Sequence, residues 1–216
     1  ASAGPIDVNR VMVVDGERDI TFHKPLPVAA SITADSSILG VFDKGKDKGA
    51  VILRKTVLKN DKGEDLATLI ASQFARGDGG FGGPSEGQPE PHAIPKRAPD
   101  MTVDISTRPD QALIYRLCGD RNPLHSDPEF AKRAGFERPI LHGMCTYGLS
   151  CRAVLQTYAD YDPSAFKQHV TRFSSPVFPG ETVSFDLWKD GNVISLEGRV
   201  KSRNVTVIRN GKTVLA

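Results

Sequence analysis

Cysteine is scarce in this sequence, and no run of apolar residues approaches the roughly 20 needed for a membrane span. The three cysteines are odd in number, lie within apolar patterns and form no C-x-x-C pair: Cys118, Cys145 and Cys151. We therefore expect buried thiols of a reducing compartment, and neither a disulfide framework nor a zinc site. The first residues, ASAGPIDVNR, resemble neither a signal peptide nor a transit helix.

An excess of either charge is also missing. Lys and Arg number 28 and Asp and Glu 26, so the 216 residues carry a net charge of +2. This balance gives no strong field for nucleic acid, although a local basic patch would suffice for a phosphorylated small molecule. His23, His92 and His169 are scattered and have no ligand partners at metal spacing, so we interpret them as surface or packing residues and expect no metal.

Glycine and proline are concentrated in one stretch, residues 77–100. Such a stretch sustains neither a helix nor a central strand. We place a linker at residues 81–100, between a first unit at residues 1–80 and a second at residues 101–216.

The first unit shows a meander of three strands, at residues 29–42, 50–58 and 66–74, joined by the turns KGKDKG and NDKGED. No helix pattern precedes these strands, so the first unit is expected to lack its helix.

The second unit begins with helix signals. A helix is predicted over residues 108–118, ending at Gly119. Asp127 and Pro128 are typical of an N-cap and first turn, and Gly135 closes this second, short helix.

A longer helix is predicted over residues 140–158, with an apolar stripe at Met144, Gly148, Cys151, Leu155 and Tyr158. Each glycine within it costs about 1 kcal/mol relative to alanine. We therefore expect its small residues to permit close packing against a curved sheet.

Alternation then predicts strands. The segments ETVSFDLW and VISLEGRV flank an Asp-Gly at 190–191, which is a strong hairpin signal. A further hairpin is expected at the Asn-Gly of positions 210–211.

The loop YRLCGDRNPLHSD, residues 115–127, holds the most reactive combination of side chains. Asp120 and Asn122 are compatible with two interpretations: they cap an ordinary turn, or Asp120 pairs with His125 as an acid and base. Pro123 restricts the backbone between them, so a fixed separation is possible.

The longer string Y-R-L-C-G-D-R-N-P-L-H, followed by F-A-K-R-A-G-F-E-R-P-I-L-H-G-M, resembles the hydratase 2 motif of the (R)-specific enoyl-CoA hydratases in the MaoC-like group. The first-unit strings F-H-K-P-L-P, F-D-K-G and G-G-F-G-G resemble the two-unit hydratases, which include the hydratase domain of peroxisomal multifunctional enzyme type 2. The resemblance implies an α+β, double hot-dog fold, in which antiparallel sheets wrap around a central helix. The first hot-dog unit is incomplete at its N-terminus.

The implied reaction is reversible hydration of trans-2-enoyl-CoA to (R)-3-hydroxyacyl-CoA, a hydro-lyase activity of fatty-acid β-oxidation. By resemblance, Asp120 and His125 are the catalytic acid and base, and the order of their roles stays open. Asn122 orients the water or holds the loop. Gly143 is the candidate oxyanion residue, because first-turn amides of a helix lack intrahelical partners. His142 is interpreted as a structural, hydrogen-bonded core residue.

The resemblance also implies substrate-binding positions: Gly16, Lys44, Arg121, Pro123, Leu124 and Phe173. Where the two-unit family has His-Gly before the first strand, this chain has Asp15-Gly16, so only a backbone contact is expected there.

Two other functions remain compatible with the sequence. One is a 3-hydroxyacyl thioester dehydratase of fatty-acid or polyketide synthesis, and the other is a non-catalytic acyl-CoA-binding partner subunit. We expect an acyl-CoA thioester as ligand, no cofactor beyond the CoA of the substrate, and a homodimer. The C-terminus GKTVLA carries no S-K-L-type address, so we favour a bacterial cytoplasm, or a peroxisome for a eukaryotic protein.

Overall fold

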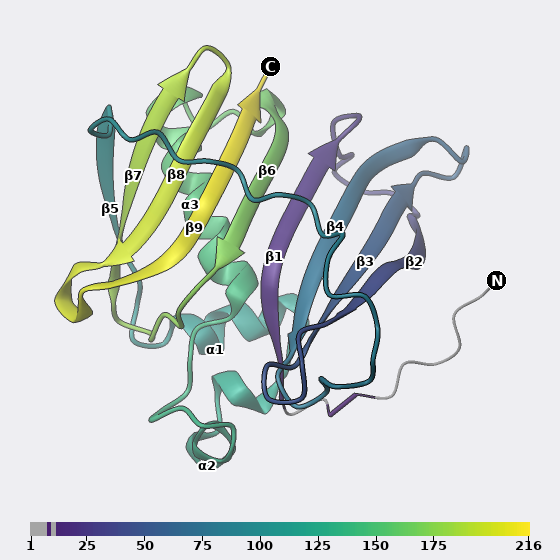
Figure 1. Cartoon of the computed structure of the whole chain (residues 1–216). Helices are drawn as coiled ribbons and strands as arrows, with labels where there is room; N and C mark the ends of the chain where they lie inside the picture. Colours follow the sequence, from purple (N-terminus) through teal and green to yellow (C-terminus); the bar gives the residue numbers. More distant parts are fainter. Residues whose placement is uncertain (1–7, 10–11) are drawn as a thin grey trace. The chain divides into compact units, whose positions relative to one another are not determined.

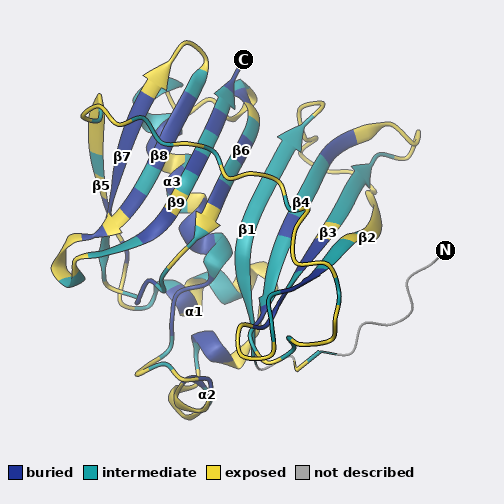
Figure 2. Cartoon of the chain, in the orientation of Figure 1, coloured by how far each residue is buried: buried dark blue, intermediate teal, exposed yellow. Residues whose placement is uncertain are grey.

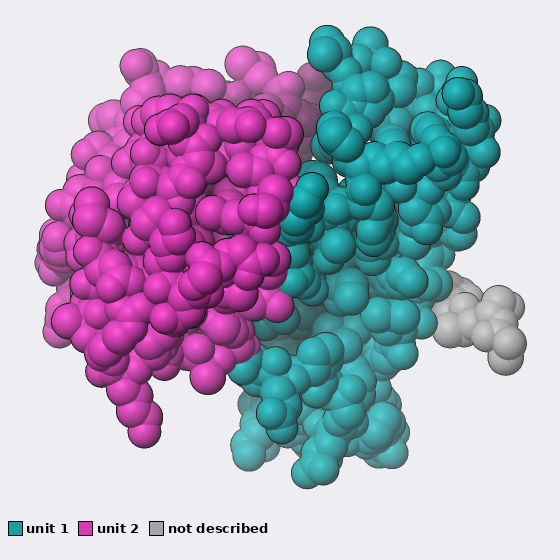
Figure 3. Space-filling view, turned by 90° about the horizontal axis from the view of Figure 1, so that it is seen from above, with its two compact units in different colours: residues 1–91, 167–170 teal, residues 92–166, 171–216 magenta. Residues whose placement is uncertain are grey.

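The structure is a computed structural model that describes residues 8, 9 and 12–216. The chain divides into two compact units, which Figure 3 shows in different colours. Unit 1 comprises residues 1–91 with residues 167–170, and unit 2 comprises residues 92–166 and 171–216.

Unit 1 contains an antiparallel meander. Its strands are β1 (Val13–Phe22), β2 (Thr33–Asp43), β3 (Ala50–Lys59) and β4 (Asp65–Ala75), in the order β2-β3-β4-β1 (Figure 1). The three predicted strands and both turns are confirmed. Strand β1 was not predicted, and Gly16 lies inside it rather than before it, at a bulge between Asp15 and Glu17. Bulges break the alternation on which strand prediction depends. In the described part of unit 1 no α-helix is present, as expected.

A buried carboxylate organises the loops of unit 1. Asp43, at the end of β2, accepts hydrogen bonds from the backbone amides of Gly45 at 2.8 Å and of Gly80 and Gly82 at 2.7 Å each. These backbone hydrogen bonds, led by that from Gly80, hold the pKa of Asp43 below its usual value. The start of the glycine-rich stretch is therefore fastened to the end of β2.

Unit 2 contains β5 (Met101–Ser106), β6 (Phe166–Phe173), β7 (Thr182–Asp190), β8 (Val193–Val200) and β9 (Val205–Leu215), in the order β6-β9-β8-β7-β5. Residues 167–170 of β6 are those grouped with unit 1. The predicted hairpin at 190–191 is confirmed: Asp190 pairs with Val193, and Gly191 has a φ of 64°. Strands β5 and β6 were not predicted.

The second predicted hairpin is wrong, because β9 runs unbroken through Asn210 and Gly211. Leu196 of β8 pairs with Gly211 and Gly198 pairs with Ile208, so two residues of β9 face one of β8. Asn210 has a φ of 53°, and the Asn-Gly pair therefore forms a bulge instead of a turn.

The helices of unit 2 lie between β5 and β6 in the sequence. They are α1 (Gln111–Tyr115), α2 (Pro128–Arg133) and α3 (Gly143–Tyr158), with 3₁₀ turns η2 (Arg116–Cys118) and η3 (Pro123–His125) between α1 and α2. The predicted helix over residues 108–118 is thus a short α-helix continued by a 3₁₀ turn. The predicted cap of α2 is confirmed, since the Asp127 carboxylate accepts from the amides of Glu129 and Phe130.

The buried face of α3 differs from the predicted stripe. Its buried residues are Cys145, Thr146, Tyr147, Ser150, Ala153 and Val154. Gly148 is exposed, and a Cβ added there would meet nothing within 4 Å. Gly148 is therefore not required for close packing, contrary to our prediction. In unit 2, α3 lies behind the strands (Figure 1), and Figure 2 shows buried positions on β7, β8 and β9.

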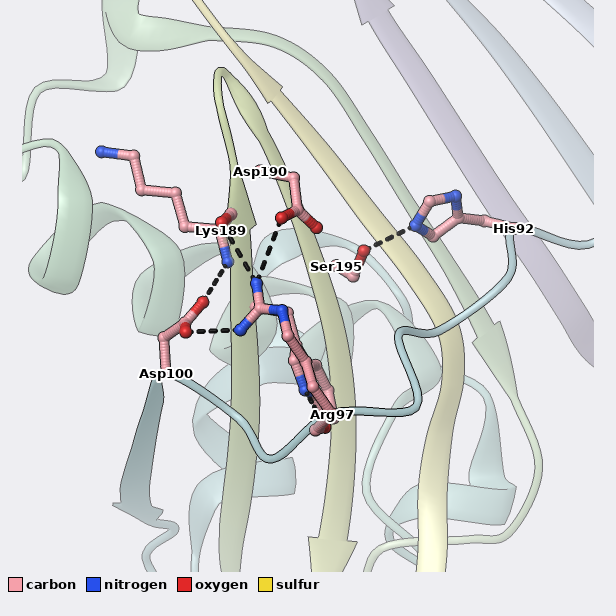
Figure 4. Close-up of polar contacts among 7 residues, drawn as sticks. His92, Arg97, Asp100, Lys189, Asp190 and Ser195 are labelled. Carbon is pink, nitrogen blue, oxygen red and sulfur yellow. Dashed lines mark hydrogen bonds and ion pairs between the residues drawn. The ribbon is translucent and has the colours of Figure 1, made fainter.

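Residues 92–100 are fastened to the strands of unit 2 (Figure 4). His92 hydrogen-bonds Ser195 of β8 at 2.8 Å, and the indole Nε1–H of Trp188 donates to the carbonyl oxygen of Arg97 at 2.8 Å. The Arg97 guanidinium contacts Asp100 at 2.5 Å and Asp190 at 3.2 Å. We call residues 92–100 the strap.

All three cysteine thiols are free. Cys145 is buried and Cys151 half-buried, but Cys118 is exposed, so our prediction of a buried thiol is wrong at that position. Cys118 is the last residue of the 3₁₀ turn η2, and none of the three residues of this turn is buried. Among the helices that the structure describes, none is long and apolar enough to cross a bilayer.

Candidate active site

The loop that carries Asp120, Asn122 and His125 is held by its own side chains. The Asp120 carboxylate accepts from the amide of Asn122 at 3.1 Å, and the Asn122 side chain accepts from the amide of Leu124 at 3.1 Å. Pro123 occupies the first turn of η3. The turn-capping interpretation is therefore correct, and it leaves the carboxylate of Asp120 exposed on a stiff loop.

A hydrophobic cluster anchors the same loop. Leu124 is buried in a core cluster with Ala131, Ala134, Ile140 and Phe178. Because Leu124 lies between Pro123 and His125, its burial fixes the direction in which the neighbouring side chains leave the loop.

His125 is buried and has a defined tautomer. Its Nδ1 lies 2.8 Å from the carbonyl oxygen of Ile140. A carbonyl oxygen only accepts, so Nδ1 carries the proton and, in the neutral ring, Nε2 carries the lone pair. The residue is thus suited to accept a proton through Nε2.

His142 lies against both members of the predicted acid–base pair. It is only 1% exposed, and its Nε2 lies 3.2 Å from the backbone oxygen of Asp120. Its ring stacks on that of His125, with centroids 3.8 Å apart and an interplanar angle of 26°, and Tyr115 packs nearby at 4.8 Å. Burial lowers the pKa of His142, against the opposing effect of the hydrogen bond to Asp120. Our prediction of a hydrogen-bonded core histidine is confirmed.

The polar atoms of Asp120, His125 and His142 converge. One carboxylate oxygen and one nitrogen of each ring all lie within 4.8 Å of one another. A water that accepts and donates at ordinary hydrogen-bond lengths of about 2.8 Å spans such a separation between Asp120 and His125. The arrangement therefore suits an acid and a base acting on one water.

The same three side chains are the nearest approach to a metal-binding set among the described residues. Two histidines that share a metal direct their ring lone pairs at one point. The stacked rings of His125 and His142 are nearly parallel, so their in-plane lone pairs do not meet at a common centre. The donor set fits proton transfer better than metal binding.

Gly143 is the first residue of α3, and His142 is its N-cap. The first amides of a helix have no intrahelical acceptor and lie at the positive end of the helix dipole. Gly143 is half-buried, and the first turn contains no acidic residue. The start of α3 therefore offers a donor for negative charge directly beside the two stacked histidines.

The remaining predicted positions lie elsewhere on the chain. Arg121 and Pro123 are exposed on the loop, and Phe173 is half-buried at the end of β6. Gly16 and Lys44 belong to unit 1, where the Lys44 ammonium donates to the carbonyl oxygen of Ser85 at 2.5 Å. Because the Leu124 side chain is in the core, only its backbone is available to a ligand.

Two residues have a larger part in these arrangements than the sequence indicated. We had assigned His142 only to the core, although its position beside Gly143 placed it at the start of the long helix. Asp43 is the aspartate of the string F-D-K-G, and its carboxylate joins that string to G-G-F-G-G through the amides of Gly80 and Gly82.

Comparisons with known proteins agree with this architecture. Residues 90–211 match the family described as "MaoC like domain", and residues 2–77 match "MFE-2 hydratase 2 N-terminal domain". "Enoyl-CoA hydratase ChsH3" of Mycobacterium tuberculosis is 42% identical over 206 residues, which cover 95% of this chain and 71% of the relative. "Peroxisomal multifunctional enzyme type 2" of Mus musculus is 42% identical over 207 residues, 95% of this chain and 28% of the relative.

A solved structure, a MaoC-like dehydratase from Phytophthora capsici, superposes with a TM-score of 0.89 at 36% identity. The match covers 96% of this chain and 73% of that one. Structural likeness of this kind confirms the α+β hot-dog fold. The chain belongs to the MaoC-like hydratase family, with an N-terminal part related to the hydratase 2 region of multifunctional enzyme type 2.

Proposed function

We propose that this chain catalyses the reversible hydration of trans-2-enoyl-CoA to (R)-3-hydroxyacyl-CoA in fatty-acid β-oxidation. The activity is that of a hydro-lyase. The observation that carries the proposal is the convergence of the Asp120 carboxylate and the His125 imidazole within 4.8 Å on a stiff loop. Family membership supports the same reaction class.

Hydration adds the oxygen of water to the β-carbon and a proton to the α-carbon of the thioester. One group must take a proton from the water, and another must deliver a proton to carbon. The neutral His125 ring presents its Nε2 lone pair, and the Asp120 carboxylate is a second acceptor. Either group suits the base of the forward reaction, and the other must then start protonated so that it delivers its proton to the α-carbon. Return of the proton taken from water, from the base to the acid, restores the pair, and the same steps run backwards in dehydration.

Gly143 is proposed to stabilise the charge that develops on the thioester oxygen. The absence of a side chain allows that oxygen to approach the amide closely, and the positive end of α3 favours negative charge there. Asn122 is proposed to keep the loop rigid, since it caps η3 through the amide of Leu124.

The substrate is proposed to contact two sets of positions. In unit 2 these are Arg121, Pro123, Phe173 and the backbone of Leu124, and in unit 1 they are Gly16 and Lys44. We further propose that the protein is a homodimer that needs no cofactor beyond the CoA of its substrate, in a bacterial cytoplasm or in a peroxisome. Gel filtration with light scattering tests the dimer.

The direct test is incubation of the purified chain with crotonyl-CoA, followed by chiral analysis of the 3-hydroxybutyryl-CoA formed. We expect the (R) product. An (S) product, or binding of the thioester without turnover, would refute the proposal, and the latter result would favour the non-catalytic partner subunit. Faster turnover of carrier-protein thioesters than of CoA thioesters would favour a dehydratase of fatty-acid or polyketide synthesis.

A further inference from the structure

His142 takes no proton in the proposed chemistry, yet its side chain contacts both the loop at Asp120 and the ring of His125. It is fixed at the start of α3, the longest helix of the described chain, with neighbouring residues Leu141 and Cys145 also buried. A rigid residue thus lies against two groups whose relative placement decides the reaction. The argument that follows rests on the proposed hydratase function.

The first contact holds the backbone of Asp120. The carbonyl oxygen of Asp120 only accepts, so Nε2 of His142 carries the proton in this 3.2 Å hydrogen bond. Asp120 follows Gly119, whose φ of 112° ends the preceding turn, and it lies on an exposed loop. The hydrogen bond therefore ties an exposed carboxylate to a buried element 22 residues away in the chain.

The second contact holds the ring of His125. Rotation of that ring about its bond to Cβ is limited on one edge by the hydrogen bond to Ile140 and on one face by the ring of His142, 3.8 Å away. Together these contacts fix the direction in which Nε2 of His125 points. Catalytic geometry tolerates little displacement, since an error of about 1 Å reduces the rate by about 100-fold.

The stacked ring also has a defined charge. With Nε2 protonated, a second proton on His142 would go to Nδ1, which is buried and has no hydrogen-bond partner in the described part of the chain. That position disfavours the imidazolium. A neutral aromatic face next to His125 is attractive when His125 becomes a cation. The titratable groups that surround His142 include Tyr115, Arg116, Asp120, His125 and, one turn along α3, Cys145.

We propose that His142 is a positioning residue that sets the separation of Asp120 and His125 through its Nε2–H and sets the titration of His125 through its neutral ring face. These two contributions come from different parts of one side chain. Different substitutions therefore remove them separately.

The experiment uses the full chain and three variants. His142→Gln keeps an N–H at the position of Nε2 and loses the ring, His142→Phe keeps a ring and loses the donor, and His142→Ala loses both. The matched control is His92→Gln, in the strap, outside the machinery of the reaction. For each protein we measure kcat and KM for crotonyl-CoA from pH 5 to 9, the Tm, and the pH titration of the His125 ring by NMR.

For His142→Phe we expect kcat to fall about tenfold, the order that one lost hydrogen bond represents, with KM within about twofold of wild type. For His142→Gln we expect the acid limb of the kcat/KM profile and the NMR titration of His125 to move together to lower pH, by about half a unit. His142→Ala should show both effects, and His92→Gln neither.

The inference is overturned if all three His142 variants show the same kcat loss in proportion to Tm and leave the His125 titration unchanged, because His142 would then be only a core residue. Wild-type kcat in His142→Phe would overturn it as well. A wild-type protein without hydratase activity would refute the proposed function instead, and the NMR titration would still decide whether His142 controls His125.

Discussion

His125 donates its Nδ1–H to the carbonyl oxygen of Ile140, 2.8 Å away. In the proposed mechanism one imidazole has two separate tasks: Nδ1–H fastens the ring to the backbone, and Nε2 is proposed to exchange the proton of the reaction. The two tasks are separable by substitution, since an asparagine amide reproduces the donor at Nδ1 but offers no base at Nε2.

We predict that His125→Asn lowers kcat/KM for crotonyl-CoA by about 10²–10⁴-fold, the usual contribution of a general acid or base, while its unfolding free energy stays close to that of wild type. His125→Ala should lose activity equally and in addition lose about 1–2 kcal/mol of stability, because the buried carbonyl of Ile140 loses its donor. Steady-state kinetics and urea unfolding separate the two. Equal stability losses in both variants would show that the hydrogen bond is unimportant.

Gly148→Ala is predicted to stabilise unit 2 by about 1 kcal/mol, because the position is helical, exposed and free of neighbours within 4 Å of the added Cβ. The matched change Gly198→Ala, in β8, should destabilise by about 1–3 kcal/mol. Its Cβ would lie 2.9 Å from Cε1 of Phe185 and 3.2 Å from Cβ of Ile208. Urea unfolding measures the change in unfolding free energy of both variants. Changes of the same sign would contradict the packing described for α3 and β8.

Acid should destabilise the fold through buried histidines. Burial lowers the pKa of His169 to about 3, against about 6.5 in an unfolded chain. Between these values the unfolded state binds a proton that the folded state does not, so stability decreases as pH falls, by about 1.4 kcal/mol per pH unit. We expect His169→Gln to remove this part of the slope in urea unfolding between pH 6 and 4. An unchanged slope would show that His169 is not the group responsible.

Asp43→Ala should release the glycine-rich loop, since the amides of Gly45, Gly80 and Gly82 lose their common acceptor. Limited proteolysis is expected to cut within residues 77–91 faster in this variant, whereas the exposed-turn control Asp47→Ala should match wild type. The depressed pKa of Asp43 adds a pH test. The loop should be protected from proteolysis above pH 3.8, the ordinary pKa of an aspartate carboxyl, and should lose that protection as the pH falls through the lower pKa of folded Asp43. A cleavage rate that Asp43→Ala leaves unchanged would contradict this role of Asp43.

Local signals in the sequence were sufficient for the elements that begin or end abruptly. Asp127 with Pro128 predicted the start of α2, and Asp-Gly at 190–191 predicted the hairpin between β7 and β8. The Asn-Gly at 210–211 carried the same kind of signal and was misinterpreted, because a residue with positive φ serves a bulge as well as a turn.

The candidate site was predictable only in part, because some of its contacts are local in the sequence and others join distant segments. The motif places Asp120, Asn122 and His125 on one loop, so their proximity follows from the chain itself. The contacts of His142 join segments 22 residues apart, and they depend on how α3 packs against the loop. A contact of this kind cannot be predicted from periodicity or motif spacing. The buried face of α3, on which it depends, was itself predicted wrongly.

The central claim is that Asp120 and His125 act together on one water, and a double-mutant cycle tests it most directly. The measurement is kcat/KM for crotonyl-CoA in Asp120→Asn, His125→Asn and the double variant. We predict that each single variant loses at least about 100-fold and that the double variant is no slower than the slower single one, as for residues that act as a unit. Losses that multiply in the double variant, or near-wild-type activity in either single variant, would contradict the account.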